Sequence, residues 1–97
     1  MEKRYWVYII TNKPYGTLYT GITNNLARRM YEHREGLYKG FAKEHGLKTL
    51  VWYAEFKSAD EAISFEKRIK KWRRDWKKQL IEKINPEWLD LYEKLQE

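Results

Sequence analysis

Two tyrosines and two arginines near the start of the chain could together handle a phosphate group. Tyr8 and Tyr19 stand eleven positions apart on either side of a turn that contains Pro and Gly, and Arg28 and Arg29 follow. A guanidinium presents a fork of donors that matches phosphate oxygens. A tyrosine accepts a proton only where nearby cations or a metal offset its high pKa. Because such residues more often serve packing or ion pairs, they need support from the rest of the chain.

The phase of the helix after the second tyrosine separates the two arginines. We expect this helix from Asn24 to about Glu35, with Gly36 ending it. Its buried stripe is expected to contain Leu26, Met30, His33 and Leu37. At about 100° per residue, Arg29 lies about 70° from the middle of this stripe, whereas Arg28 lies nearly opposite to it. We therefore expect Arg29 and His33 at the mouth of a cleft against the hairpin, and Arg28 in solvent.

The relation between the two tyrosines depends on where the hairpin is centred. If the centre lies between Lys13 and Pro14, Tyr8 and Tyr19 are directly opposite each other and on the same face of the sheet. A one-residue shift of the centre is expected to put them on opposite faces. The sequence alone leaves this register open.

The chain predicts an α+β fold with a small three-stranded antiparallel sheet flanked by helices. β-branched, aromatic and alternating apolar residues mark strands at Tyr5–Thr11, Leu18–Ile22 and Lys48–Phe56. Three glycines and no clear period indicate a loop over residues 36–46. With the helices, the order becomes ββαβαα, and we expect a single domain over residues 1–97.

Two helices are expected in the second half of the chain. Ser58, with Glu61 in the capping-box position, starts a long helix whose apolar stripe reaches about Leu80 and breaks near Asp75. After an Asn-Pro pair, a last short helix is expected over Glu87 to Leu95, with Pro in an early helical position.

Glu66 lies on the border of the apolar stripe of the long helix, where a carboxylate has two possible uses. It could ligate Mg²⁺, which takes one or two carboxylates and otherwise water and phosphate. It could instead form an i,i+4 ion pair with Lys70, which is the commoner use of a helical Glu. The residues by themselves leave both uses open.

The net charge of +6 is concentrated in one segment. Between Glu66 and Lys83 there are nine Lys and Arg residues against three acidic residues, so this segment carries the whole imbalance. A clustered basic stripe favours a polyanionic partner, although a solvated helix face explains the charge alone equally well.

Composition excludes several classes of protein. Because there are no cysteines, a disulfide framework and a thiolate metal site are both excluded. No apolar run approaches the length of a membrane span, and the start MEKRYW has no signal-peptide pattern, so we expect a cytoplasmic protein without a membrane. The aromatic fraction is 16%, which helps a small core and could also stack on nucleic-acid bases.

Taken together, these features resemble the GIY-YIG nucleases. Val7-Tyr8 followed by Tyr19-Thr20-Gly21 is similar to the paired signature of that family. Arg29 falls ten residues after the second tyrosine, as the family's arginine does, and Glu66 stands where the family carries its metal-binding glutamate. The runs TGITNNLARRMYEH and NPEW look most like small, stand-alone members related to the N-terminal nuclease domain of excinuclease ABC. The resemblance covers nearly the whole chain.

The resemblance implies a metal-dependent endonuclease that hydrolyses phosphodiester bonds in DNA and could act in DNA repair or processing. Glu66 would hold Mg²⁺ or Mn²⁺, which would polarise the scissile phosphate. Arg29 would balance charge in the transition state, and His33 would assist proton transfer. Tyr8 or Tyr19 would take the proton from the attacking water, and the choice between them stays open.

The same resemblance assigns the basic segment to the phosphate backbone. The residues expected to bind nucleic acid without reading its bases are Lys70, Arg73, Arg74, Lys77 and Lys78. The substrate stays open between a flap, a junction, a damaged duplex and RNA, and a monomer is favoured.

Two other functions compete with this interpretation. One is a non-catalytic nucleic-acid-binding module that retains the fold. The other is a protein-interaction domain that uses Trp72, Trp76 and Trp88 as exposed anchors. The joint presence of two tyrosines, an arginine and a glutamate at the family's spacings argues against both, because a scaffold does not require them together.

Overall fold

The sheet of the protein has three antiparallel strands with the first strand in the middle. A computed structural model describes residues 3–96. In it, β1 (Tyr5–Thr11) pairs with β2 (Leu18–Thr23) on one side and with β3 (Thr49–Phe56) on the other. The three expected strands are therefore confirmed to within one residue at each end, and the α+β class is confirmed as well. Since β2 and β3 are both edge strands, only β1 is paired along both sides.

The register of the hairpin differs from the expected one. Tyr8 pairs with Gly21 and Ile10 pairs with Tyr19, so the prediction that the two tyrosines are directly opposite is wrong. The centre lies one residue farther along the chain, next to Tyr15, which has a positive φ of 60°. A one-residue shift of the centre moves the pairing by two residues, so the tyrosines stay on the same face and become diagonal neighbours. The expectation that such a shift would separate them is therefore wrong too.

The helix after the hairpin begins and ends through capping interactions that the sequence predicts. In α1 (Leu26–Arg34), the Asn25 side chain accepts a hydrogen bond from the backbone N–H of Arg28 at 3.0 Å. At the other end, Gly36 takes a φ of 71° and the N–H of Leu37 donates to the Glu32 carbonyl at 2.8 Å, which is a Schellman cap. This reversal turns Leu37 into solvent, so its expected burial in the apolar stripe is wrong.

The later helices match the sequence in part. Ser58 caps α3 (Ala59–Lys70) by accepting the Glu61 N–H at 3.4 Å, as expected. The long helix breaks slightly before Asp75, because Arg73 is extended and α4 (Arg74–Ile84) starts anew. A four-residue helix, α2 (Phe41–Glu44), replaces part of the expected loop.

The last expected helix is mostly wrong. Trp88 takes a positive φ of 57°, which interrupts a right-handed helix, and only the 3₁₀ turn η1 (Tyr92–Gln96) is helical. None of the helices in the part of the chain that the structure describes has the length and apolar character needed to cross a bilayer.

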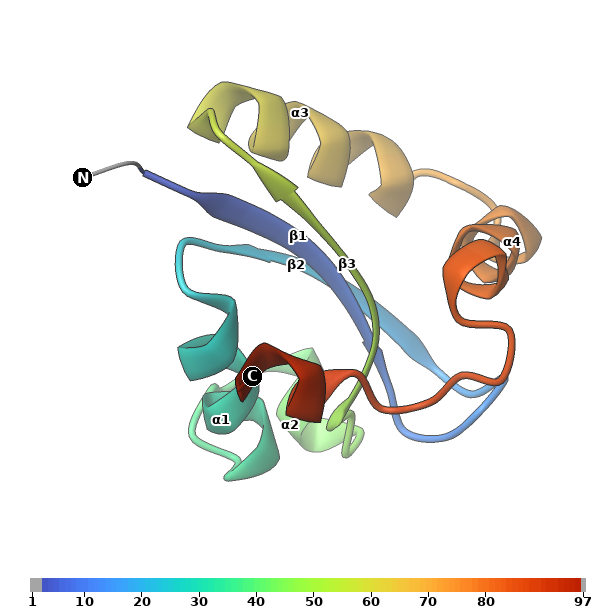
Figure 1. The fold of residues 1–97 in the computed structure, drawn as a ribbon. Coiled ribbons are helices and arrows are strands. Elements are labelled where there is room, and N and C mark those ends of the chain that lie inside the picture. The colour runs from blue at the N-terminus through green and yellow to red at the C-terminus, as the bar shows by residue number, and fades with distance from the viewer. Residues whose placement is uncertain (1–2, 97) are drawn as a thin grey trace.

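Helices cover both faces of the sheet (Figure 1). On one face, with α3 and α4, lies a buried cluster of Val7, Ile9, Val51, Trp52, Ala62, Ile69, Ile81 and Trp88. On the other face, with α1, α2 and η1, lies a second cluster of Tyr8, Ile10, Leu26, Met30, Ala42, Leu47 and Leu50. Alternate residues of β1 enter the two clusters, so the middle strand is buried on both faces.

Asn85 holds the segment after α4 against the sheet. Its side-chain amide donates to the carbonyls of Val51 at 3.0 Å and Leu89 at 2.9 Å, and its side-chain oxygen accepts from the Leu89 N–H at 3.0 Å. Because Asn85 is buried, water cannot readily replace it as the partner of these backbone groups. Its interactions end α4 and direct Trp88 back into the core.

Asn85→Ala is expected to lower the free energy of unfolding by about 2–4 kcal/mol, because it removes three hydrogen bonds at a buried position. Urea denaturation followed by tryptophan fluorescence would measure this. Asn24→Ala, at an exposed position, serves as the control and should change the value by less than about 0.5 kcal/mol. Equal stability of the two variants would contradict the role given to Asn85.

Candidate active site

Tyr8 is the innermost residue of the candidate site. It is completely buried in β1, and its phenol oxygen lies 2.9 Å from Nε2 of His33 on α1. The ring crosses the position opposite on β2, where a Cβ on Gly21 would come within 2.4 Å of the phenol oxygen. A side chain at position 21 would therefore collide with the phenol, and glycine leaves the space that lets Tyr8 reach α1.

The Tyr8–His33 hydrogen bond has a defined direction. Burial raises the pKa of the Tyr8 phenol above its ordinary value, only partly opposed by a hydrogen bond with Arg29. Burial, followed by the charge of Arg29, lowers the pKa of His33 to about 4. Because the phenol keeps its proton and the imidazole is neutral, the phenol O–H donates to Nε2. Nδ1 of His33 then carries the ring proton, and it has no hydrogen-bond partner within residues 3–96.

Arg29 lies at the edge of this cluster, and Arg28 lies in solvent, as the helix phase predicted. The Arg29 guanidinium donates from Nη1 to the Ile22 carbonyl at 3.3 Å and its Nε lies 3.3 Å from Glu32. It also lies 4.0 Å from the centroid of the Tyr38 ring. Burial lowers the pKa of Arg29, but its hydrogen bond with Tyr8 and the nearby negative charges raise it overall. The guanidinium is thus a permanent cation beside the phenol.

Tyr38 is a member of the cluster that sequence reasoning missed. Its ring packs edge-on against His33 with 5.1 Å between centroids, and its other contact is the guanidinium of Arg29. It lies in the connection between α1 and α2, two residues after Gly36, where the sequence showed no period. The sequence contains no signal for its role, because the contact depends on the chain reversal at the end of α1.

Tyr19 connects this cluster to the opposite layer of helices. Its ring centroid lies 6.4 Å from that of Tyr8 and 6.0 Å from that of His33. Burial raises the pKa of Tyr19, Tyr38 adds to the rise, and Lys70 and Arg29 oppose it. Because Lys70 belongs to α3, this edge-strand tyrosine responds to charges from both helical layers. Unlike Tyr8, it is only partly buried and can contact solvent.

Glu66 lies on α3 and forms the ion pair that the sequence offered as its alternative use. Its Oε2 lies 2.7 Å from Nζ of Lys70, and Glu66 is 9% exposed. Its charge acts on Tyr19 and raises the pKa of that phenol, which places the carboxylate on the Tyr19 side of the sheet. The sequence-predicted residues Tyr8, Tyr19, Arg29 and His33 thus lie together, with Glu66 approaching across the edge of β2.

The donor set suits a divalent cation that takes most of its ligands from elsewhere. Over residues 3–96, no three His, Asp or Glu side chains come together as a metal cluster. Glu66 supplies one carboxylate, and Mg²⁺ is usually bound in proteins by one or two carboxylates with water and phosphate in the remaining positions. The residues therefore fit a cation that shares its coordination with a substrate phosphate, provided that Lys70 releases the carboxylate.

The five basic residues predicted to bind nucleic acid fall into two groups. Arg74 donates from Nη2 to the carbonyl of Tyr15 at 2.7 Å and to that of Gly16, which ties α4 to the hairpin turn. Lys78 lies 5.4 Å from the Tyr15 ring centroid, so it belongs to the same contact. These two cations hold the fold together as well as adding charge.

The other three cations are on the α3–α4 junction. Nζ of Lys77 donates to the Lys70 carbonyl at 3.4 Å. Burial, together with the charges of Arg74 and Lys70, lowers the pKa of Lys77. Arg73 is exposed and lies 5.2 Å from the centroid of the Trp76 ring. This junction is the most strongly cationic part of the predicted phosphate-binding set.

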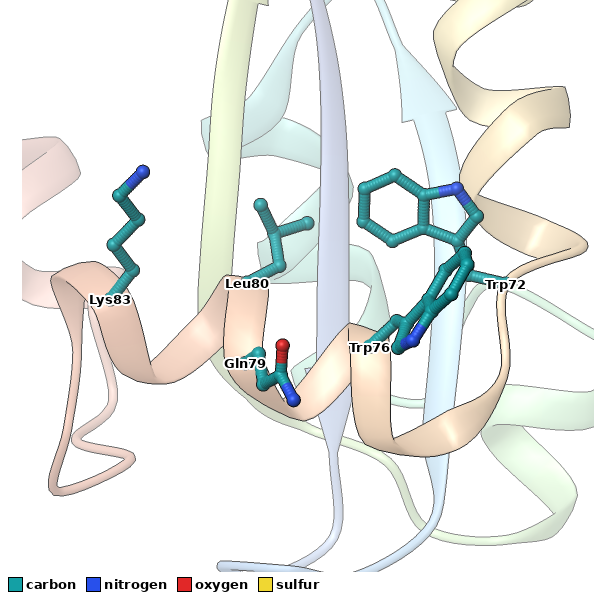
Figure 2. Close-up of a pocket in the computed structure, with 5 residues that line it drawn as sticks. All are labelled: Trp72, Trp76, Gln79, Leu80 and Lys83. Atoms are coloured by element: carbon teal, nitrogen blue, oxygen red, sulfur yellow. The ribbon is translucent and has the colours of Figure 1, made fainter.

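A groove of about 310 Å³ runs along α4 and is lined by Trp72, Trp76, Gln79, Leu80 and Lys83. Figure 2 shows the two indoles together at one end of the groove and Lys83 at the other. Trp76 is exposed, as the protein-interaction alternative requires. Trp88 is buried and donates from Nε1 to Glu82 at 2.8 Å, so the expectation that it is an exposed anchor is wrong.

Comparison with known proteins matches this geometry to one family. Residues 4–79 match the family model described as the GIY-YIG catalytic domain. The UPF0213 protein CPE1444 of Clostridium perfringens is 41% identical over 76 residues, which are 78% of this chain and 81% of that protein. A UPF0213 protein of Cronobacter sakazakii is 37% identical over 76 residues, 78% of this chain and 80% of that protein.

A solved structure agrees with the sequence comparison. The solution NMR structure of the UPF0213 protein BH0048 from Bacillus halodurans has a TM-score of 0.56 and 28% identity. The match covers 90% of this chain and 92% of that one. With the tyrosine pair on one face of the sheet, Arg29 beside it and a family match over most of its length, the chain belongs to the GIY-YIG family, among its small UPF0213 members.

Proposed function

We propose that this protein is a divalent-metal-dependent endonuclease that hydrolyses phosphodiester bonds in DNA, directed by the structure of the DNA rather than by its sequence. Membership of the GIY-YIG family supports a nuclease acting on nucleic acid, and GIY-YIG nucleases are generally dependent on divalent metals. The observation that carries the proposal for this chain is the convergence on Tyr19 of Arg29 from α1 with Glu66 and Lys70 from α3. We further propose a cytoplasmic role in DNA repair or processing, performed by a single-domain monomer.

The two tyrosines have different roles in this proposal. Tyr8 is completely buried and already donates to His33, so it cannot contact an attacking water in this arrangement. Tyr19 is partly exposed, and it is the phenol that accepts the proton from water. Lys70 and Arg29 lower the pKa of Tyr19 against the effect of burial, and both cations would also favour its deprotonated form during the reaction.

The remaining residues position and balance charge. Arg29, oriented by Tyr8 and Tyr38, donates to the oxygens of the scissile phosphate as negative charge develops there. His33 holds the Tyr8 hydroxyl in place. Glu66 would hold one Mg²⁺ or Mn²⁺, which when bound supplies Lewis-acid polarisation of the phosphate. Lys70 leaves Glu66 and turns to the phosphate backbone when the substrate is present.

One observation favours a second candidate, a nucleic-acid-binding module without catalysis. Lys70 neutralises Glu66 at 2.7 Å, so the carboxylate is already satisfied without a metal. Such a module would bind DNA with strong salt dependence and would not cut it with Mg²⁺ or Mn²⁺ at any enzyme concentration. Cleavage assays on branched and flapped DNA separate the two functions.

Glu66→Ala is expected to reduce metal-dependent cleavage of branched or flapped DNA by about 100-fold or more, because Glu66 is the carboxylate proposed to hold the cation. Binding of the same DNA without metal should stay within about threefold, since a freed Lys70 adds to the attraction for phosphate. Glu61→Ala, at an exposed carboxylate of the same helix, is the control and should cut normally. Undiminished cutting by the Glu66 variant would refute the assignment.

Arg29→Ala should reduce cleavage by about 100-fold, the usual effect of removing one charged donor from a transition state. Arg28→Ala should change it by less than about twofold, because that side chain points into solvent. Single-turnover rates on one flapped substrate would compare the two neighbours directly. Equal losses in both variants would mean that general charge, rather than the position of Arg29, is what matters.

The neutral state of His33 predicts a pH dependence of stability. Between about pH 6.5 and pH 4 the unfolded chain binds a proton on His33 that the folded protein excludes, because folding lowers the pKa of His33 to about 4. Stability should therefore fall as the pH is lowered from 7 to 5, by about 1–2 kcal/mol from this residue. Urea denaturation at both pH values should show a smaller loss for His33→Gln. A loss of the same size in both proteins would contradict a buried, neutral His33.

A further inference from the structure

Three aromatic rings continue outward from Tyr19. The Phe41 ring is nearly parallel to that of Tyr19, with 18° between their planes and 6.4 Å between centroids. The His45 ring is in turn nearly parallel to that of Phe41, at 23° and 4.1 Å. The three rings form an aromatic stack, which we define as Tyr19, Phe41 and His45. It begins at the phenol that we propose accepts the proton.

The backbone of α2 holds the outer two rings in place. Ala42 and Leu47 are buried in the core beneath the sheet, and the Leu47 N–H donates to the Ala42 carbonyl at 2.9 Å. With that side of the segment fixed, Phe41 and His45 lie one helical turn apart on its outer side. Nδ1 of His45 donates to the Phe41 carbonyl at 3.0 Å, which sets the orientation of the imidazole. The stack is therefore organised before any ligand arrives.

Folding alone gives no reason for this arrangement. Phe41 is 46% exposed, and His45 at the outer end of the stack is exposed as well. An aromatic side chain that stays half in water contributes little to the core, and single exposed apolar residues do not usually align with other rings. A ligand with a flat aromatic face would use this surface.

The charge around the stack favours a nucleic acid as that ligand. The segment that carries Phe41 and His45 also carries exposed Lys39, Lys43 and Lys48, against one exposed acid, Glu44. Positive charge attracts the phosphate backbone, while aromatic rings stack on bases without regard to sequence. A protein partner would be expected to need a larger apolar area than three aligned rings provide.

We propose that the aromatic stack binds an unpaired nucleobase of the substrate, next to the phosphate that is cut. This inference rests on the proposed nuclease function and narrows its substrate. A base inside a duplex has both faces covered by its neighbours, so it cannot stack on His45 or Phe41. The substrates are therefore nucleic acids with unpaired nucleotides beside the scissile bond, such as a flap, an overhang or a bulge.

The test compares single-stranded and duplex DNA under conditions where nothing is cut. Fluorescence anisotropy in EDTA would give Kd values for a single-stranded oligonucleotide and for a blunt duplex of the same sequence. Phe41→Ala and His45→Ala should each weaken single-strand binding by about 5- to 50-fold, the effect of losing one stacking contact. Duplex binding should stay within about twofold, because it depends on the phosphate backbone.

Two further variants identify stacking as the cause. Phe41→Trp keeps a flat ring and should retain single-strand binding, whereas Phe41→Leu keeps apolar bulk and should lose it. Tyr31→Ala removes an exposed aromatic residue from α1 and serves as the control, with no expected change. Quenching of a 2-aminopurine base in the oligonucleotide on binding should disappear in Phe41→Ala. Circular dichroism and urea midpoints would show that each variant is folded.

The outcomes separate this inference from the function on which it rests. If the wild type binds and cuts DNA but the Phe41 and His45 variants bind single strands normally, the base-binding stack is refuted and the nuclease stands. Equal weakening on single strands and duplex would also refute it. If the wild type binds neither form, the proposed function and this inference fail together, and a protein ligand for the stack becomes the better explanation.

Discussion

The hydroxyl of Tyr8 is buried in the middle of the sheet, where it has no access to water and requires a hydrogen-bond partner from the protein. His33 provides that partner at 2.9 Å, and Arg29 adds a second contact. Both come from α1, so the buried phenol also determines the rotation of that helix about its axis. The ring can reach α1 only because Gly21 has no side chain on the neighbouring strand. A tyrosine, a glycine, an arginine and a histidine that are separated in the sequence therefore depend on one buried polar group.

The edge strand β2 joins the two helical layers of the protein into one site. Tyr19 lies on the face covered by α1, yet the charges of Glu66 and Lys70 on α3 act on it across the open edge. A central strand could not do this, because neighbouring strands would separate the layers. The same exposure that makes an edge strand a liability elsewhere gives a substrate access to both layers here. The Glu66–Lys70 pair keeps the nearly buried carboxylate compensated until another cation replaces the lysine.

Local patterns predicted what depends on local geometry. The bounds of β1, the Ser58 cap and the opposite placement of Arg28 and Arg29 all follow from periodicity and capping, and the structure confirms them. Predictions that extended a pattern past a reversal of the chain were wrong. Leu37 follows the left-handed residue that ends α1, so it leaves the apolar stripe. Trp88, expected on a helix surface, is carried into the core by a positive φ and by the hydrogen bonds around Asn85.

The sequence by itself determined the family, the three strands and the identity of the residues that meet at the site, because their types and spacings form one ordered set. Only the tertiary structure decided how they are used. It buried Tyr8 and left Tyr19 accessible, paired Glu66 with Lys70, and aligned Phe41 with Tyr19. These outcomes depend on the hairpin register and on packing between segments far apart in the chain. Burial and long-range contact set the charge and accessibility of a side chain, and neither is encoded in the residues immediately around it.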